Sequence, residues 1–82
     1  MVPSDTNPIR EYTALLHPAA EGGFWAEVPA LPGCLSQGET VEETLANVQE
    51  AAAAHLQALR DEGKEVPPDE GVLVARVTVP GP

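Results

Sequence analysis

One segment of this 82-residue chain has a strong helical pattern, and it limits the folds open to the rest. Thr40 and Glu43 fit a capping box at its start, in which each side chain accepts from the other residue's backbone N–H. Gly63 suits the position just past the end of the helix, and Pro67 prevents continuation. We therefore expect one helix over residues 41–62, with a single apolar stripe. The stripe comprises Val41, Leu45, Val48, Ala52, Leu56 and Leu59.

The segments around this helix alternate apolar and polar residues as β-strands do. The alternation predicts strands at residues 10–17, 24–28, 34–37 and 72–79, and the glycines at 22–23 join the first two in an antiparallel hairpin. The predicted fold class is α+β, a small β-β-β-α-β sheet with one helix packed on one face. The other face has no helix to cover it, so it must be polar or be buried against another copy or another protein.

The short length predicts one domain and favours self-association. We expect a flexible tail at residues 1–9, the domain at residues 10–79 and a C-terminal tail at residues 80–82. A domain this small buries roughly 60–65% of the surface that its unfolded chain exposes, so its core is thin. Cys34 is the single cysteine and cannot form an intrachain disulfide. We therefore expect the chain to form a homodimer or a higher homo-oligomer.

The charge balance constrains both partners and location. Thirteen acidic residues against four basic ones give a net charge of -9, which repels phosphate groups and predicts no direct nucleic-acid partner. The acidity serves either solubility or complementarity to a basic partner. The sequence contains neither a signal-peptide pattern at its start nor an apolar run of about 20 residues. We therefore expect a cytoplasmic protein without membrane contact.

Residues with catalytic chemistry are few and scattered. His17 precedes a proline at a strand end and is interpreted as solvated, and Cys34 as a small apolar residue that begins a strand, with an exposed reactive thiol as the alternative. No catalytic, cofactor-binding or metal-binding residue is predicted. The enzymatic alternative is a metal-dependent nuclease, in which Glu11 and Glu27 would be cross-strand neighbours that bind a metal ion.

The predicted partner-binding residues come from two segments. On the strand alternation, Trp25 and Glu27 share the face opposite to Ala26. Exposed tryptophan is enriched at interface hot spots, although Trp25 would alternatively roof the core. Glu42 and Glu43 add negative charge in the first turn of the helix. We therefore predict Trp25, Glu27, Glu42 and Glu43 as contacts of a protein partner.

Several short motifs at fixed separation resemble the HicB-like antitoxin family. They are EVPALPGC at residues 27–34, QGET at 37–40, EETL at 42–45 and VPP at 66–68. The resemblance covers about residues 10–79. Physically these motifs set turns and the start of the helix, with Gly38 expected to allow an unusual backbone angle.

The resemblance implies both a fold and a partner. The implied fold is a partly degraded ribonuclease H-like domain. The implied role is that of a noncatalytic antitoxin that binds a small basic HicA-type ribonuclease toxin and covers its active surface. Many members carry an added C-terminal DNA-binding module, whereas this sequence ends at Pro82, so the resemblance implies only the toxin-binding half of that role for this chain. The remaining alternatives are the metal-dependent nuclease and an orphan interaction module with another partner.

Overall fold

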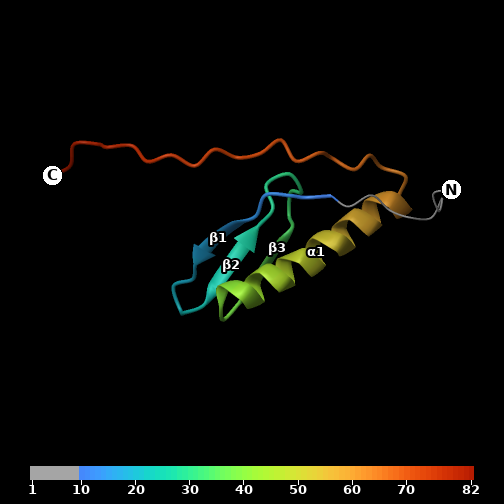
Figure 1. The fold of residues 1–82 in the computed structure, drawn as a ribbon, viewed down its shortest axis with the longest axis horizontal. Helices are drawn as coiled ribbons and strands as arrows, with labels where there is room; N and C mark the ends of the chain where they lie inside the picture. The colour runs from blue at the N-terminus through green and yellow to red at the C-terminus, as the bar shows by residue number, and fades with distance from the viewer. Residues whose placement is uncertain (1–9) are drawn as a thin grey trace.

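Three strands and one helix form the ordered body of the protein (Figure 1). The computed structural model describes residues 10–82. The strands are β1 (Leu15–Pro18), β2 (Phe24–Glu27) and β3 (Leu35–Gly38), and the helix is α1 (Val41–Asp61). The strands pair antiparallel in the order β1-β2-β3, and α1 lies on one face of this sheet. The predicted α+β class with one covered face is confirmed.

The first hairpin is shorter than the alternation predicts. Pairing begins at Leu15, and Pro18 is the last paired residue, opposite Phe24. Residues 10–14 lie before β1 and are unpaired. Tyr12, Ala14 and Leu16 nevertheless pack against the core, as their shared face predicts. The predicted tail at residues 1–9 lies outside the described residues.

A small core fills the space between α1 and the sheet. Its buried apolar side chains are Ala26, Val28, Leu31, Cys34 and Val48. The helical stripe only partly matches this core. Val48 is 4% exposed, but Val41 and Leu45 are 41% and 42% exposed, while Thr44 is fully buried. The face of α1 that meets the sheet is therefore rotated toward Thr44, which the apolar stripe did not predict.

Thr44 and Gly38 explain the close contact between α1 and β3. The Thr44 hydroxyl donates a hydrogen bond to the Thr40 carbonyl at 2.7 Å, which satisfies this buried polar group. A Cβ atom on Gly38 would lie 2.7 Å from the Thr44 backbone nitrogen. Gly38 is not among the glycines with a positive φ. The expectation of an unusual backbone angle is therefore wrong, and glycine is needed because the helix start lies directly against it.

Both ends of α1 have the caps that the sequence predicts. The Thr40 hydroxyl accepts from the Glu43 backbone N–H at 3.0 Å, while the Glu43 carboxylate accepts from the N–H of Glu39, one residue before the expected partner. At the other end, Lys64 N–H donates to the Leu59 carbonyl at 2.8 Å and Gly63 N–H to that of Arg60 at 3.0 Å. This is the Schellman arrangement, which ends the helix at Asp61, one residue earlier than predicted.

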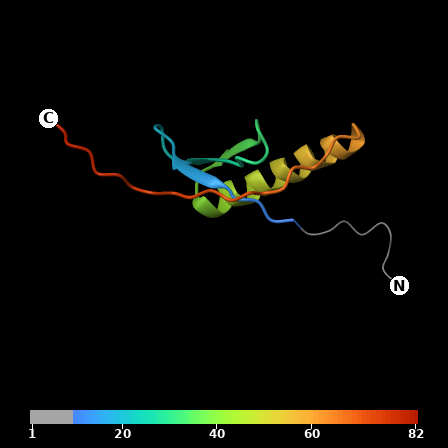
Figure 2. The same ribbon diagram turned by 90° about the horizontal axis from the view of Figure 1, so that it is seen from above.

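The predicted final strand is not part of the sheet. Residues 64–82 have no assigned secondary structure, and residues 72–79 are all exposed, with Leu73 at 99%. In both views this segment runs as an extended arm to the C-terminus (Figure 2). The strand assignment for residues 72–79 is therefore wrong for this chain by itself. Alternation gives a segment its propensity, but a strand also needs a partner backbone, and residues 72–79 pair with none of the described strands.

Candidate protein-binding site

The sheet face away from α1 carries the candidate site, and we call it the open face. Ala26 is buried beneath α1, so its neighbours Trp25 and Glu27 project to the opposite side. The antiparallel register aligns two cross-strand rows there: His17, Trp25 and Gln37 in one, and Leu15, Glu27 and Leu35 in the other. The prediction that Trp25 and Glu27 share one face of the sheet is confirmed, and the burial of Ala26 beneath α1 shows that this is the uncovered face.

Three side chains on the open face hold one another in place. The rings of His17 and Trp25 stack with centroids 4.1 Å apart and planes 17° apart. His17 Nε2 lies 2.8 Å from Glu27 Oε2, and the two side chains are 38% and 35% exposed. We call these three residues the aromatic cluster. The interpretation of His17 as a simply solvated side chain is wrong, because its ring stacks on Trp25 and its Nε2 contacts Glu27.

A shallow hollow lies beside the aromatic cluster. It is lined by Trp25, Leu35, Ser36 and Gln37, and Leu35 is 57% exposed. Trp25 is not among the side chains that pack against the core, so the alternative in which it roofs the core is wrong. Sequence reasoning missed His17 and Leu35 as site residues. Strand alternation places both on the same face as Trp25 only when the strand register and the face covered by α1 are known.

A second, more polar hollow lies at the start of α1. The carboxylates of Glu21, Glu39 and Glu43 line it, and Gln37 borders both hollows. Asn47 joins the helix to this strand end, since its Nδ2 donates to the Gln37 carbonyl at 2.7 Å. Several carboxylates around one concave surface make its potential negative. The open face and the helix start are thus connected through β3.

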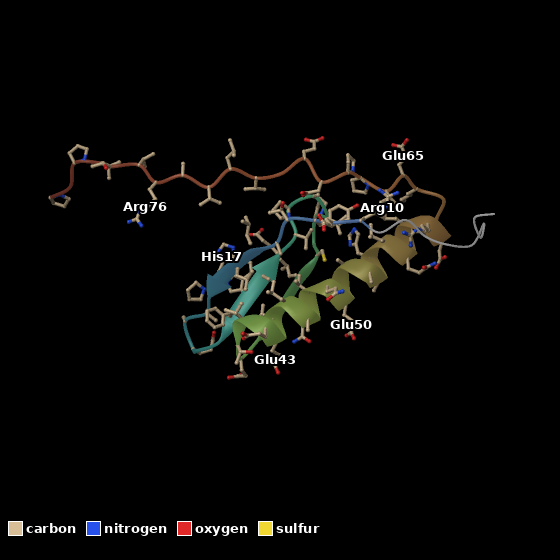
Figure 3. The ribbon with its side chains drawn as sticks, in the orientation of Figure 1. Arg10, His17, Glu43, Glu50, Glu65 and Arg76 are labelled. Atoms are coloured by element: carbon tan, nitrogen blue, oxygen red, sulfur yellow. The ribbon has the colours of Figure 1, made fainter. Side chains whose placement is uncertain are left out.

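The four predicted partner contacts therefore fall into three positions. Trp25 and Glu27 belong to the aromatic cluster, whereas Glu43 lines the polar hollow. Figure 3 shows Glu43 at the start of α1 and His17 on β1. Glu43 also caps α1, so its carboxylate is partly engaged. Glu42 is exposed in the first turn and lines neither hollow. The structure brings together three of the four residues on adjoining surfaces.

The residues considered for catalysis are arranged differently from the predictions. The cross-strand partner of Glu27 is Leu15, and Glu11 lies before β1, so the interpretation of Glu11 and Glu27 as cross-strand neighbours is wrong. Over residues 10–82, no three His, Cys, Asp or Glu side chains are grouped to hold a metal ion.

Cys34 lies within the core. It is 4% exposed, and burial raises the pKa of its thiol. A buried thiol with a raised pKa is a poor nucleophile, because the thiolate is the reactive form. The interpretation as a small apolar residue leading into β3 agrees with this position, and the alternative of an exposed thiol is wrong.

No helix among the described residues is both long and apolar enough to cross a membrane.

Comparison with known families gives a match across most of the chain. Residues 12–78 match the family described as the HicB_like antitoxin of bacterial toxin-antitoxin system. The UPF0150 protein ssl0259 of Synechocystis is 45% identical over 56 residues, which cover 68% of this chain and 77% of the relative. The UPF0150 protein Ta0767 of Thermoplasma acidophilum is 37% identical over 59 residues, covering 72% and 86% of the two chains.

A solved structure resembles this chain in both fold and sequence. It is a chain of a HicA3 and HicB3 toxin-antitoxin complex, with a TM-score of 0.62 and 33% sequence identity. The similarity covers 73% of the present chain and 70% of the solved one. The fold of this chain is thus similar over most of its length to that of a protein solved in a toxin–antitoxin complex.

Proposed function

This chain belongs to the HicB-like antitoxin family of bacterial toxin–antitoxin systems, and on that premise we propose that it binds and neutralises a small, basic, mRNA-cleaving toxin of the HicA type. The observation that carries the proposal is the likeness to a chain of the HicA3 and HicB3 complex. In that assembly a chain of this fold is found together with a toxin. We extend the same kind of partnership to the present protein.

The surface properties of the chain support a basic partner. Its net charge is -9, and carboxylates line the polar hollow at the start of α1. A negative surface accelerates encounter with a positive one and suppresses the wrong partners. A small basic nuclease needs its positive charge to bind RNA, so an acidic protein that binds the same surface competes with the RNA phosphates.

We assign the contact to the open face and the adjoining helix start. Trp25 offers a large apolar surface of fixed orientation, because His17 stacks on its indole. Interface hot spots are enriched in such aromatic anchors. Exposed Leu35 extends the apolar area, and Glu27 and Glu43 provide negative charge at its borders. The proposed action is steric and electrostatic, so it requires no catalytic residue or cofactor in this chain.

Co-expression with a HicA-type toxin tests the proposal. The toxin alone should arrest growth, the pair should grow, and the two proteins should co-purify. In vitro, purified toxin should cleave RNA, and addition of this chain should stop the cleavage in proportion to complex formation. Absence of both rescue and complex, with the chain folded by circular dichroism, would reject the toxin as its partner and favour an orphan interaction module.

A second assay separates binding from catalysis. The pure chain is incubated with RNA and Mg²⁺ or Mn²⁺ in the absence of toxin. We expect no cleavage above the buffer control. RNA cleavage that disappears in Glu27→Gln would instead support the metal-dependent nuclease. Glu50→Gln provides the matched control, because Glu50 is an exposed carboxylate on α1 (Figure 3).

A further inference from the structure

We propose that residues 72–79 form a β-strand on the free edge of β1 in a second copy of this chain, and that two copies exchange these segments reciprocally. This inference does not depend on the antitoxin role. It starts from the composition of these eight residues, which read VLVARVTV. Valine, leucine and threonine favour strands, and every second residue of the segment is apolar. All eight residues are exposed, including Leu73 at 99%, Val77 at 82% and Val79 at 71%.

The same chain also offers a place for such a strand. In the order β1-β2-β3, one side of β1 is an edge without a partner among the described strands. α1 packs on β3 and β2, so the side of the sheet near β1 is less covered. A mostly apolar groove opens beside residues 10–14, which lead into β1, and its lining includes Tyr12, Ala14, Leu45, Val48, Ala52 and Leu56. An added strand at this edge would receive backbone hydrogen bonds and lay apolar side chains toward the groove.

The register of the arm excludes most pairing within one copy. The Tyr12 hydroxyl donates to the Pro67 carbonyl, and the Thr13 hydroxyl donates to Asp69 Oδ2 at 2.9 Å. These two contacts fix the arm beside residues 12–13, with both segments running in the same direction. Continued at this offset, residues 72–79 would lie beside residues 16–23, but β1 ends at Pro18. At this offset at most three of these residues would lie beside β1 in their own copy, whereas in a second copy the offset is not fixed and all four residues of Leu15–Pro18 can pair with the middle of the segment.

After these two contacts the chain runs away from its own sheet, which agrees with the small number of residues that could lie beside β1 in the same copy. Gly71 has a φ of +81°, which lies in the left-handed region that side-chain-bearing residues rarely adopt. Beyond it the arm leaves the body and continues past β1, as both ribbon views show. Beyond Gly71 the chain pairs with no strand of its own copy, so we assign the sheet edge for residues 72–79 to a second copy.

The charge of the arm favours a second copy over a basic partner. Residues 72–79 contain Arg76 and no acidic residue, whereas the chain as a whole carries -9. Arg76 would alternate with Ala75 and Val77 and so lie on the open face of the receiving sheet, where Glu27 is found. A basic toxin would be repelled by Arg76. Direct pairing of two arms is also less favourable, because an isolated two-stranded ribbon is marginally stable in water.

Mixed-isotope NMR on the full chain tests the proposal without a mutation. Chains labelled with ¹⁵N and chains labelled with ¹³C are mixed, and only contacts between copies are selected. We expect cross-strand contacts from residues 72–79 to Leu15–Pro18, and a particle mass twice the 8.6 kDa of one chain by light scattering. A single-chain mass, the same contacts found only within one copy, or a dimer whose arm remains mobile would each overturn the proposal.

Two variants of Val77 provide an independent test. Val77→Pro removes a backbone donor and should convert the dimer to a monomer, while Val77→Ile keeps strand propensity and should remain dimeric. The helical circular dichroism signal should be unchanged in both, since Val77 lies outside the α1 fold. A Val77→Pro chain that stays fully dimeric contradicts the exchange. Toxin binding measured on both variants distinguishes this outcome from failure of the antitoxin proposal.

Discussion

His17 Nε2 lies 2.8 Å from a carboxylate oxygen of Glu27 on the face of the sheet that α1 does not cover. The contact crosses from β1 to β2 and runs diagonally, because the direct cross-strand partner of His17 is Trp25. The imidazole therefore touches both residues that strand alternation placed on a common face. This relationship makes the aromatic cluster a pre-organised surface, and it leads to the first two predictions.

Charge reversal in the aromatic cluster should weaken toxin binding. Glu27→Lys removes a negative charge and the partner of His17, so we expect the Kd for the HicA-type toxin to rise by about tenfold or more. Isothermal titration calorimetry measures this change. Glu50→Lys is the control with the same change in net charge, and it should have a much smaller effect. Equal losses in both variants would mean that only overall charge matters and that the open face is not the contact.

Removal of the indole should affect binding more than folding. Trp25→Ala deletes the apolar anchor, and hot-spot substitutions of this kind cost about 2 kcal/mol or more of binding free energy. Trp25 lies outside the core, whereas Val48 is 4% exposed within it. Val48→Ala should therefore lower the free energy of unfolding more than Trp25→Ala does. Urea denaturation and calorimetry on both variants check the two halves of this prediction, and unchanged toxin affinity in Trp25→Ala would place the interface elsewhere.

Substitution of Gly38 should destabilise the contact between α1 and β3. A Cβ there would lie 2.7 Å from the Thr44 nitrogen and 2.8 Å from its hydroxyl oxygen, and the backbone atom has little freedom to move away. We expect Gly38→Ala to lower the free energy of unfolding by about 1–3 kcal/mol, the usual range for overpacking. Gly81→Ala is the control, because a Cβ at Gly81 meets nothing within 4 Å. Equal stability of the two variants in urea denaturation would contradict the close approach.

Loss of the Thr40 hydroxyl should weaken the start of α1. This hydroxyl accepts the Glu43 N–H at 3.0 Å, and removal of such a cap typically costs about 1 kcal/mol. Thr40→Ala should therefore lower the midpoint of urea denaturation, while Thr40→Ser should retain most of the stability. Because the Thr40 carbonyl, not its side chain, accepts from Thr44, both variants keep that buried hydrogen bond. A serine variant as unstable as the alanine variant would exclude capping as the cause.

The buried thiol of Cys34 should make the fold sensitive to alkaline pH. Burial raises its pKa above the ordinary value of 9.0, so the folded state holds the proton more tightly than the unfolded state does. The stability linked to this proton is complete below pH 9 and is lost as the pH rises through the higher pKa of the folded state. Cys34→Ala should show a flatter decline in denaturation midpoint above pH 9. Iodoacetamide should also modify the native chain much more slowly than the urea-unfolded chain at the same pH.

Local features of the fold could be predicted from the sequence. The bounds and caps of α1, the hairpin, and the shared face of Trp25 and Glu27 all depend on residues close together in the chain. Helical spacing, capping side chains and strand alternation act over a few residues, so they are readable without the tertiary structure. The family resemblance, which depends on short motifs at fixed separation, was confirmed by the match over residues 12–78.

Other features were decided only by the tertiary structure. The register between β1 and β2 brought His17 onto Trp25, and the close approach of α1 to β3 buried Thr44 and required Gly38 to be glycine. These outcomes depend on distances between segments that the sequence does not record. The arm at residues 72–79 shows the same limit most clearly. Its sequence determined that it can be a strand, but hydrogen bonds in a sheet need a second backbone, and only the three-dimensional arrangement decided that it pairs with no described strand of its own copy.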